Sequence, residues 1–297
     1  MSYEELWRPL AEVYGAGEAK AIARMVLDVC FGLSLSDILC GKVTNLSADD
    51  QQKLQKIRTR LLAGEPVQYV LGVAEFGGRQ FKVGPGVLIP RPETYELCQW
   101  VLDDGCWVLD EGCSMLGDGC NILDIGTGSG CIACTLAAAL PQASVTGWDI
   151  SADALAIAEE NAKRASVHVS FEQVDILHPS SNTHHPSPLT HHPSPFTHIV
   201  SNPPYICESE AAEMEPHVLH HEPHLALFVP NDDPLLFYRS IADFALTALK
   251  QKGRLYFEIN PPYADLLRDM LLTKGFQQVS SKEDQFGKLR FIQATRP

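Results

Sequence analysis

Hydrophobic residues recur in two rhythms along this chain, and the rhythm changes near residue 65. In the first part they return every three or four positions, as Leu6 and Leu10 do, and again Ile22 and Val26. This spacing puts apolar side chains on one face of a helix. Residues 1–65 are therefore predicted to form a small helical bundle, in which no residue by itself indicates a chemical reaction.

Short extended pieces separated by glycines follow the helical part. Residues 68–72 are expected to be extended, and Gly77-Gly78 is typical of a tight hairpin turn. Two prolines then hold residues 87–94 extended, with an arginine and a glutamate presented beside them; this segment could also act only as a rigid link between domains. We predict a β-hairpin connector over residues 66–92.

From residue 93 to the C-terminus, predicted strands alternate with predicted helices. Strands are expected at residues 121–125, 144–148, 167–174, 198–201 and 254–259, helices at 131–140, 154–165, 233–249 and 263–274, and a closing antiparallel pair at 276–279 and 289–294. This alternation predicts an α/β fold with a mostly parallel, doubly wound sheet and helices on both faces. Such folds bind ligands at the carboxyl ends of their strands.

Two stretches do not fit this alternation. Residues 103–120 are acidic and aperiodic, and we predict an inserted surface loop there. Residues 178–198 contain a tandem Thr-His-His-Pro-Ser-Pro repeat, which has little to pack and is predicted to be a flexible insertion. Neither its histidines nor the nine cysteines of the chain show the spacing of a structural metal site. We expect no metal, and we expect the cysteines to be free thiols.

A glycine-rich turn, Gly126-Thr127-Gly128-Ser129-Gly130, joins the strand at 121–125 to the helix after it. Such a turn lets the backbone approach a ligand, and the helix N-terminus favours a carboxylate or phosphate. Asp149 ends the next strand, at the position where such folds usually bind a ribose diol. Cys131 stands where a dinucleotide-binding motif has its third glycine. The pattern favours S-adenosyl-L-methionine over a nicotinamide or flavin cofactor, so an oxidoreductase is the disfavoured alternative.

The apolar strand at 199–201 stops at a rigid polar turn, Asn202-Pro203-Pro204-Tyr205. The two prolines lack backbone N–H groups, so the turn presents carbonyl acceptors without donors beside them. The Asn202 side chain adds a further carbonyl, and Tyr205 adds a flat aromatic face. A planar group that carries an NH₂ can be held here, which indicates methylation of a weakly nucleophilic nitrogen. The alternative is an ordinary turn at the end of a strand.

The composition narrows the class of protein. A hydrophobic content of 45% and a charged content of 20% are typical of a globular protein. A net charge of −14 disfavours a nucleic-acid-binding protein, which normally has a basic face. The sequence has no apolar run of transmembrane length and begins with acidic residues, so we expect a cytoplasmic protein without membrane association.

Several segments together resemble the peptide-chain release factor glutamine methyltransferases. The resemblance covers most of the chain and is carried by Gly64–Gly72, Val87–Thr94, Ile122–Gly130, Asn202–Ile206 and Glu222–Leu227. The Asn-Pro-Pro-Tyr motif occurs across amino-methyltransferases, whereas the Ile-Pro-Arg-Pro-Glu-Thr segment after a helical N-terminal region is more specific. The resemblance implies a class I methyltransferase fold with a Rossmann-like sheet, in which residues 93–297 form the catalytic domain.

The resemblance also implies roles for individual residues. Residues 126–130 would cradle the methionine part of S-adenosyl-L-methionine, Asp149 would bind the ribose hydroxyls, and Asp175 would lie beside the adenine. Ile176 belongs to the same cofactor site, although the family often has an aromatic residue there. Asn202, at the junction with the cofactor, would hold the acceptor amide together with Pro203, Pro204 and Tyr205; of these, Asn202, Pro203 and Tyr205 would be catalytic.

The acceptor implied by the resemblance is the glutamine of the Gly-Gly-Gln motif of class 1 release factors. Residues 1–65 would dock that factor, and we expect a monomer that does not bind nucleic acid directly. A second Asn-Pro-Pro-Tyr copy at Asn260–Tyr263, where the family usually has a glycine and then a glutamine, is expected beside the site but not in it.

Three alternatives stay open at this point. One is a methyltransferase that acts on a ribosomal-protein glutamine or on an adenine amino group in nucleic acid. Another is a non-catalytic module that only binds S-adenosyl-L-methionine, although an intact Asn202–Tyr205 turn argues against it. For Asp175, a simple turn residue is the alternative to an adenine contact.

Overall fold

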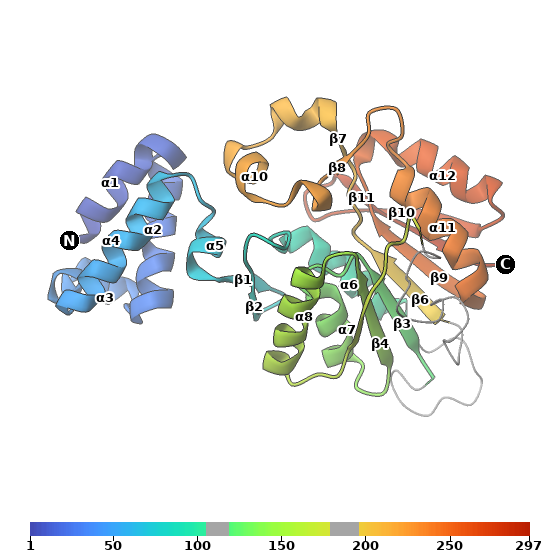
Figure 1. The fold of residues 1–297 in the computed structure, drawn as a ribbon, viewed down its shortest axis with the longest axis horizontal. Coiled ribbons are helices and arrows are strands. Elements are labelled where there is room, and N and C mark those ends of the chain that lie inside the picture. Colours follow the sequence, from blue (N-terminus) through green and yellow to red (C-terminus); the bar gives the residue numbers. More distant parts are fainter. Residues whose placement is uncertain (105–118, 179–195) are drawn as a thin grey trace. The chain divides into compact units, whose positions relative to one another are not determined.

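The computed structural model describes residues 1–104, 119–178 and 196–297, which form two compact units (Figure 1). The first unit comprises Met1–Val73 together with Met214–His221, and the second comprises the described residues of Ala74–Glu213 and Glu222–Pro297. The predicted loop at 103–120 and the predicted insertion at 178–198 fall mostly outside the described residues.

The first unit is helical. Its elements are α1 (Tyr3–Tyr14), α2 (Ala16–Phe31), α3 (Leu35–Leu39), the 3₁₀ turn η1 (Lys42–Asn45), α4 (Ala48–Leu62), α5 (Val67–Leu71) and α10 (Pro216–His221). Ser2 begins α1 with a capping box that it shares with Glu5, and Ser47 caps α4. Leu6, Leu10 and other apolar residues of these helices are fully buried against one another, so the predicted helical character of residues 1–65 is confirmed.

Residues 68–72 are not extended as predicted. They belong to α5, whose valines at 67 and 70 pack on the core of the helical unit. Gly72 ends this helix with a φ of 74°, a left-handed conformation that suits glycine. Valine and tyrosine favour strands by propensity, but here burial on neighbouring helices outweighs that preference.

A short hairpin follows, made of β1 (Val73–Phe76) and β2 (Arg79–Lys82). Gly77 and Gly78 both have positive φ and form its turn, as predicted. The expectation that residues 87–94 are extended throughout is wrong at its end, because Pro92 begins α6 (Pro92–Asp103). A proline at the first helical position suits a helix start, since its φ is already helical and its missing N–H is not needed.

The second unit is built on one seven-stranded sheet. Its strands are β3 (Asn121–Ile125), β4 (Ser144–Asp149), β5 (Ser170–Gln173), β6 (Phe196–Ser201), β9 (Leu249–Glu258), β10 (Gln277–Glu283) and β11 (Leu289–Thr295), in the order β10-β11-β9-β6-β3-β4-β5. β3, β4, β5, β6 and β9 are parallel, while β11 runs antiparallel to both of its neighbours. The predicted mostly parallel sheet with a closing antiparallel pair is confirmed.

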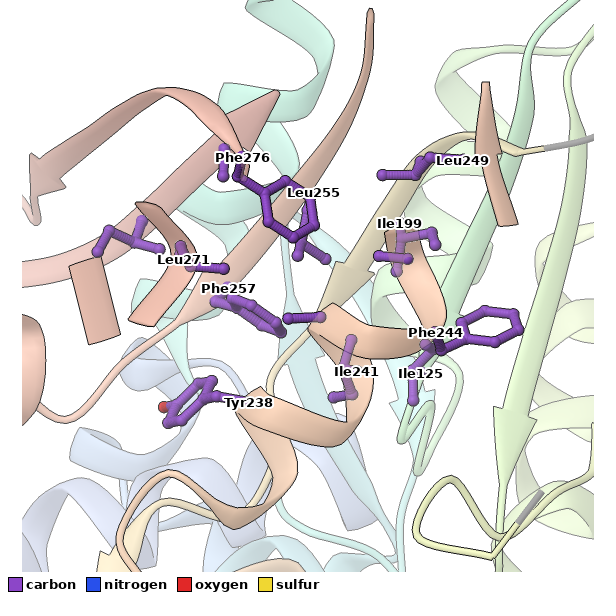
Figure 2. Packing of buried hydrophobic residues seen from close by; sticks show 14 of the residues in the cluster. Ile125, Ile199, Tyr238, Ile241, Phe244, Leu249, Leu255, Phe257, Leu271 and Phe276 are labelled. Carbon is purple, nitrogen blue, oxygen red and sulfur yellow. The ribbon is translucent and has the colours of Figure 1, made fainter. Parts of the chain in front are cut away.

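Helices cover both faces of this sheet (Figure 1). α6, α7 (Cys131–Ala139) and α8 (Ala152–Ala165) pack on one face, and α11 (Leu236–Ala248) and α12 (Ala264–Thr273) pack on the other. Consecutive residues of β6 point to opposite faces: Ile199 joins the cluster under α11 and α12, and Val200 joins the cluster under α6 and α7. Figure 2 shows the first cluster, where Phe257 and Leu255 of β9 meet Ile241 of α11. Burial on both faces explains why the strands are apolar throughout.

Several strand boundaries differ from those predicted. β6 begins at Phe196, inside the segment expected to be a flexible insertion, because Phe196 is buried in the core next to Trp148. β9 begins at Leu249 and not at residue 254, and β5 is shorter than predicted. The remaining elements are the short pair β7 (Ile206–Cys207) and β8 (Phe228–Val229), and the 3₁₀ turns η2 (Glu208–Glu213), η3 (His224–Ala226) and η4 (Pro261–Tyr263).

Most cysteines of the described residues are free thiols. Cys30, Cys40, Cys98, Cys131, Cys134 and Cys207 are free, as predicted, whereas Cys120 is disulfide-bonded, so the prediction is wrong for that residue. Sequence spacing does not reveal which cysteines approach each other in space. Burial raises the pKa of Cys131 and of Cys134 to about 12, so both remain protonated and unreactive thiols.

Two further features concern the described residues only. They contain no group of three or more histidine, cysteine, aspartate or glutamate side chains placed to hold a metal ion. Among the helices in these residues, none has the length and apolar character needed to cross a lipid bilayer.

Candidate active site

The motifs predicted from the sequence meet at one edge of the sheet. Ile125, the last residue of β3, pairs with Trp148 of β4 on one side and with Ser201 of β6 on the other. The residue after each of these is therefore at the same edge: the first glycine of the turn, Asp149 and Asn202. Because parallel strands all end there, three segments far apart in the sequence form one site.

Three residues of the glycine turn have a backbone conformation that only glycine adopts readily. Gly126, Gly128 and Gly130 have φ values of 73°, 55° and 77°. A Cβ added at Gly128 would meet nothing closer than 4.0 Å, so this part of the turn borders open space. A Cβ added at Gly130 would lie 3.0 Å from the Ala158 Cβ. Gly128 therefore leaves room for a ligand, whereas Gly130 leaves room for α8.

The two hydroxyl side chains of the turn point into the protein. Thr127 Oγ1 donates to Asp124 Oδ2 at 2.6 Å, and only 4% of Thr127 is exposed. Ser129 is also buried, and its backbone carbonyl accepts a hydrogen bond from Asn161 Nδ2 at 2.9 Å. Thr127 and Ser129, both predicted to bind the cofactor, therefore use their side chains inside the protein. Only their backbone can contact a ligand.

Asp149 is tied to the glycine turn through its carboxylate. Its Oδ2 accepts from the Gly128 backbone N–H at 2.8 Å, and its Oδ1 accepts from the Ser151 N–H at 2.9 Å. Burial raises the pKa of Asp149, and these backbone hydrogen bonds oppose that rise. Each oxygen keeps a lone pair for another donor. A carboxylate oriented in this way can accept hydrogen bonds from a diol at the edge of the sheet.

Asp124 is a buried acid that the sequence analysis did not single out. It lies within β3, fully buried, and Thr127 Oγ1 and the Ala133 N–H both donate to its Oδ2. Its Oδ1 is buried and has no partner among the described residues. Burial raises the pKa of Asp124 to about 7. An acid in an otherwise apolar strand, two positions before a glycine turn, was the signal available in the sequence.

Asp124 makes the stability of this protein depend on pH. Its folded-state pKa of about 7 lies above the ordinary value of 3.8, so the folded state binds this proton more tightly and loses stability as pH rises toward 7. Between pH 5 and pH 8 this loss amounts to roughly 2–3 kcal/mol. This loss of stability should disappear in Asp124→Asn. Denaturant unfolding of both proteins at pH 5 and at pH 8 measures it. Equal losses in variant and wild type would show that Asp124 does not titrate in this range.

Asp175 and Ile176 follow β5 at the same edge. Asp175 Oδ1 accepts from the Leu177 N–H at 2.9 Å, and its Oδ2 lies 3.0 Å from His178 Nδ1. The first of these contacts is a turn-forming interaction within the loop. Ile176 is partly buried and packs against the core cluster that contains Trp148. Both carboxylate oxygens of Asp175 therefore contact residues of its own loop, and Ile176 provides an apolar surface beside it.

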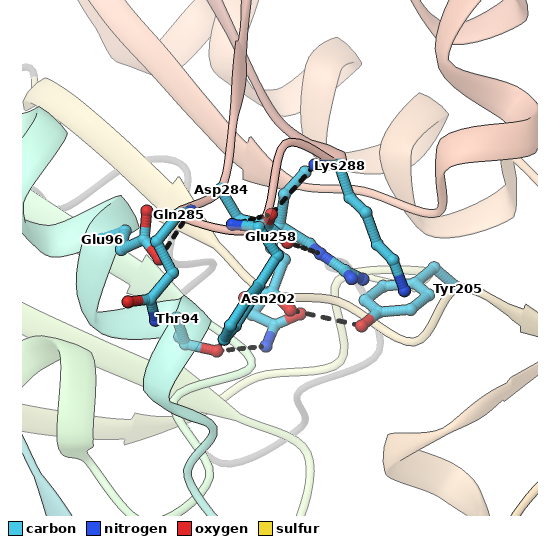
Figure 3. Close-up of polar contacts among 10 residues, drawn as sticks. Thr94, Glu96, Asn202, Tyr205, Glu258, Asp284, Gln285 and Lys288 are labelled. Atoms are coloured by element: carbon cyan, nitrogen blue, oxygen red, sulfur yellow. Dashed lines mark hydrogen bonds and ion pairs between the residues drawn. The ribbon is translucent and has the colours of Figure 1, made fainter.

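The turn at Asn202 presents an unused acceptor. Asn202 Nδ2 donates to Thr94 Oγ1 at 3.3 Å, while Asn202 Oδ1 is buried and accepts no hydrogen bond from any described residue (Figure 3). The Tyr205 hydroxyl donates to Glu258 Oε1 at 3.2 Å, and burial raises the pKa of Tyr205 far above its usual value. Tyr205 therefore remains a neutral ring. A buried acceptor without a donor is costly and indicates a place for a ligand's N–H.

The second Asn-Pro-Pro-Tyr copy lies beside this turn, as predicted. Asn260 Nδ2 donates to the backbone carbonyl of Tyr205 at 3.2 Å and to both oxygens of Glu210. The prolines and tyrosine after Asn260 form η4. The copy therefore supports the first turn from the side of β9.

Comparison with known proteins places this chain in a family. It is 42% identical over 97% of its length to the release factor glutamine methyltransferase of Bacteroides thetaiotaomicron, and covers 96% of that protein. Relatives of the same name are 37% identical in Flavobacterium psychrophilum, with 95% of this chain and 94% of that protein covered, and 35% identical in Streptococcus pneumoniae, with 95% and 93% covered. This chain belongs to the release factor glutamine methyltransferase family.

Two domain families agree with this membership, and two solved structures share the fold. Residues 10–72 match the PrmC N-terminal domain, and residues 116–223 match a methyltransferase domain. The hMettl16 catalytic domain is similar with a TM-score of 0.53 and 16% identity, over 82% of this chain and 80% of that one. The human methyltransferase 10 domain containing protein has a TM-score of 0.50 and 19% identity, over 74% and 88%. At such identities these structures show the fold alone.

The site of this family member fits S-adenosyl-L-methionine. The turn at Gly128 borders open space, and the Asp149 carboxylate has lone pairs free beside it. The unpartnered Asn202 oxygen lies at the same edge of the sheet. Together with its family membership, this makes the protein an S-adenosyl-L-methionine-dependent methyltransferase.

Proposed function

We propose that this methyltransferase transfers a methyl group to the side-chain amide nitrogen of the glutamine in the Gly-Gly-Gln motif of class 1 release factors. The relatives that bear the corresponding name match nearly the whole chain. The single observation in the structure that carries the proposal is the buried, unpartnered carbonyl of Asn202 beside two proline carbonyls. This arrangement selects an acceptor that has two N–H groups on one planar nitrogen.

The chemistry follows from the difficulty of methylating an amide. Its nitrogen shares its lone pair with the carbonyl, so it is a weak nucleophile and must be held in line with the methyl group. When bound, S-adenosyl-L-methionine supplies that electrophilic methyl group. Asn202 Oδ1 and the Pro203 carbonyl each accept one amide hydrogen, which orients the nitrogen and stabilises the positive charge that develops on it.

The remaining residues of the turn complete the acceptor site. Tyr205 is neutral and supplies a flat face for the amide plane, and Pro204 keeps the turn rigid and free of donors. The methylated amide is acidic enough to release its extra proton to water after the transfer. The mechanism therefore requires no histidine or other general base.

The cofactor site is assigned on the same basis. The backbone of residues 126–130 holds the methionine part, and the Asp149 carboxylate accepts hydrogen bonds from the ribose hydroxyls. Asp175 lies by the adenine, and Ile176 provides an apolar contact for the base. For Asp175, this role requires that its carboxylate keeps a lone pair beyond its contacts to Leu177 and His178.

The N-terminal helical region is proposed to dock the release factor. This region is folded around its own apolar core and has no residue that takes part in the chemistry above. We further propose that the enzyme works as a monomer, in the cytoplasm, where translation termination takes place. Size measurement of the purified protein, alone and with a release factor, tests the stoichiometry.

The acceptor is tested by incubating the purified protein with labelled S-adenosyl-L-methionine and purified class 1 release factors. We expect label on the Gly-Gly-Gln glutamine, located by mass spectrometry, and none on a factor in which that glutamine is replaced by alanine. Ribosomal proteins and an adenine-containing RNA serve as competing acceptors. Label on either of these, with none on the release factor, would overturn the proposal.

A further inference from the structure

Four polar side chains form a chain of hydrogen bonds behind the acceptor turn (Figure 3). Asn202 Nδ2 donates to Thr94 Oγ1 at 3.3 Å, and Thr94 Oγ1 donates to Glu258 Oε2 at 2.6 Å. The other oxygen of Glu258 accepts from the Tyr205 hydroxyl at 3.2 Å. Thr94 lies in the first turn of α6 and Glu258 ends β9, so residues from three distant segments meet at this point.

Glu258 is at the centre of this chain of hydrogen bonds. Only 2% of the residue is exposed, and among the described residues two hydroxyl donors and the nearby charge of Arg290 offset the burial of its carboxyl. Burial raises the pKa of Glu258, and the two hydroxyl donors and Arg290 oppose that rise. A buried carboxyl of this kind is costly to maintain. None of the steps proposed above makes use of it.

The chemical nature of Glu258 sets the direction of every hydrogen bond around it. While Glu258 is ionised, its carboxylate only accepts hydrogen bonds, so the hydroxyls of Thr94 and Tyr205 both donate to it. The Thr94 hydroxyl has then used its single hydrogen, and toward Asn202 it can only accept. Asn202 must therefore turn its NH₂ toward Thr94. Its carbonyl oxygen then faces the other way, as the unpartnered atom of the acceptor site.

We propose that Thr94 and Glu258 are positioning residues of the acceptor site, which orient the Asn202 carbonyl and the Tyr205 ring toward the substrate amide. This inference rests on the proposed function, because it deepens the role given there to the Asn202 turn. With the Asn202 amide reversed, an NH₂ would face the NH₂ of the acceptor, and two donors cannot pair. Thr94 and Glu258 thus determine that the site binds an amide nitrogen and does not repel it.

Replacement of the threonine hydroxyl tests this directly. Thr94→Val has nearly the same shape but cannot accept from Asn202, so we expect kcat to fall about 10- to 100-fold while KM for S-adenosyl-L-methionine stays unchanged. Thr94→Ser restores the hydroxyl and should keep kcat within about twofold. Thr135→Val is a matched control, because Thr135 Oγ1 is also buried but has no partner among the described residues. It should leave kcat unchanged.

A second measurement needs neither cofactor nor substrate. In the free protein, the two Nδ2 hydrogens of Asn202 give side-chain amide signals in NMR, and one of these hydrogens points at Thr94. We expect these signals to shift and to exchange faster with water in Thr94→Val, and to keep their wild-type values in Thr94→Ser and Thr135→Val. Unchanged Asn202 signals in Thr94→Val would overturn the proposal, whatever the acceptor turns out to be.

Glu258→Gln tests the direction of the hydrogen bonds. The new NH₂ donates to one of the two hydroxyls, so either Thr94 or Tyr205 loses its fixed orientation. We expect at least a tenfold fall in kcat, with unchanged affinity for S-adenosyl-L-methionine in calorimetry. Combined with Asn202→Ala, the Glu258 substitution should cost less than it does alone, since its effect passes through Asn202.

Two outcomes distinguish failure of this inference from failure of the proposed function. If wild-type protein does not methylate release factors but the Asn202 signals respond as expected, the acceptor is wrong and the positioning role stands. If wild-type protein methylates the glutamine but kcat of Thr94→Val and of Glu258→Gln equals that of wild type, the positioning role is wrong. Additive losses in the double variant of Glu258→Gln and Asn202→Ala would also contradict it.

Discussion

Asn202→Ala is expected to lower kcat for release factor methylation about 100- to 1000-fold, the usual effect of removing one preorganised polar group from an active site. Alanine removes the only side-chain carbonyl of the turn, whose oxygen is buried and has no partner among the described residues. The acceptor amide then keeps the Pro203 carbonyl alone, and its nitrogen is no longer held in line with the methyl group. A single-turnover assay with saturating donor and release factor measures the loss.

Donor binding separates this effect from a general disturbance of the site. Asn202 follows β6 at the edge of the sheet, whereas the glycine turn and Asp149 follow β3 and β4. Affinity for S-adenosyl-L-methionine should therefore fall only modestly in Asn202→Ala. Asn231→Ala serves as control, since it removes another asparagine side chain, whose Oδ1 accepts from the Ser209 N–H in an exposed loop. Wild-type turnover by Asn202→Ala would refute the proposed role.

Gly128→Ala is expected to weaken S-adenosyl-L-methionine binding while the protein stays folded. A methyl group at this position meets no protein atom closer than 4.0 Å, so it projects into the space where the donor is proposed to lie. Overfilling of such a space costs about 1–3 kcal/mol, which weakens binding roughly 10- to 100-fold. Because φ is 55° at Gly128, the left-handed conformation of alanine should lower stability by about 1–2 kcal/mol. Calorimetry and denaturant unfolding measure the two effects.

Gly130→Ala is the matched variant, two residues further along the same turn. Its φ of 77° carries the same strain, and its new Cβ would be 3.0 Å from the Ala158 Cβ on α8. The free energy of unfolding should therefore fall by about 2–5 kcal/mol, the sum of backbone strain and overpacking. If Gly128→Ala bound the donor as tightly as wild type, the glycine turn would not border the donor.

Short motifs of consecutive residues were enough to predict a methyl-transfer reaction from the sequence alone. The proposed roles of the glycine turn and of the Asn-Pro-Pro-Tyr turn both depend on local properties, namely positive φ, missing N–H groups and the end of an apolar strand. These properties depend on only a few consecutive residues. The alternation of strands and helices could also be predicted, because strands that are buried on both faces of a parallel sheet appear in the sequence as continuous apolar runs.

The errors in the sequence analysis arose where distant contacts outweigh local preference. Residues 68–72 resemble a strand, but burial of Val67 and Val70 on the helical unit makes them helical. Phe196 lies next to a proline- and histidine-rich repeat, yet it begins β6 because it packs against Trp148. Neither contact partner can be recognised from the neighbouring sequence.

The amino-acid sequence by itself determined which segments are strands and helices in most of the chain, and which strand ends carry the glycine turn and the Asn-Pro-Pro-Tyr turn. The sequence also indicated the family, through motifs that each consist of a few consecutive residues. Only the tertiary structure decided the strand order and register, and with them that Thr94 contacts both Asn202 and Glu258. It also decided that Asp124 is buried and that one of its oxygens has no partner among the described residues. The physical reason is that hydrogen-bond direction and burial depend on groups more than one hundred positions apart, which only the folded chain brings within contact.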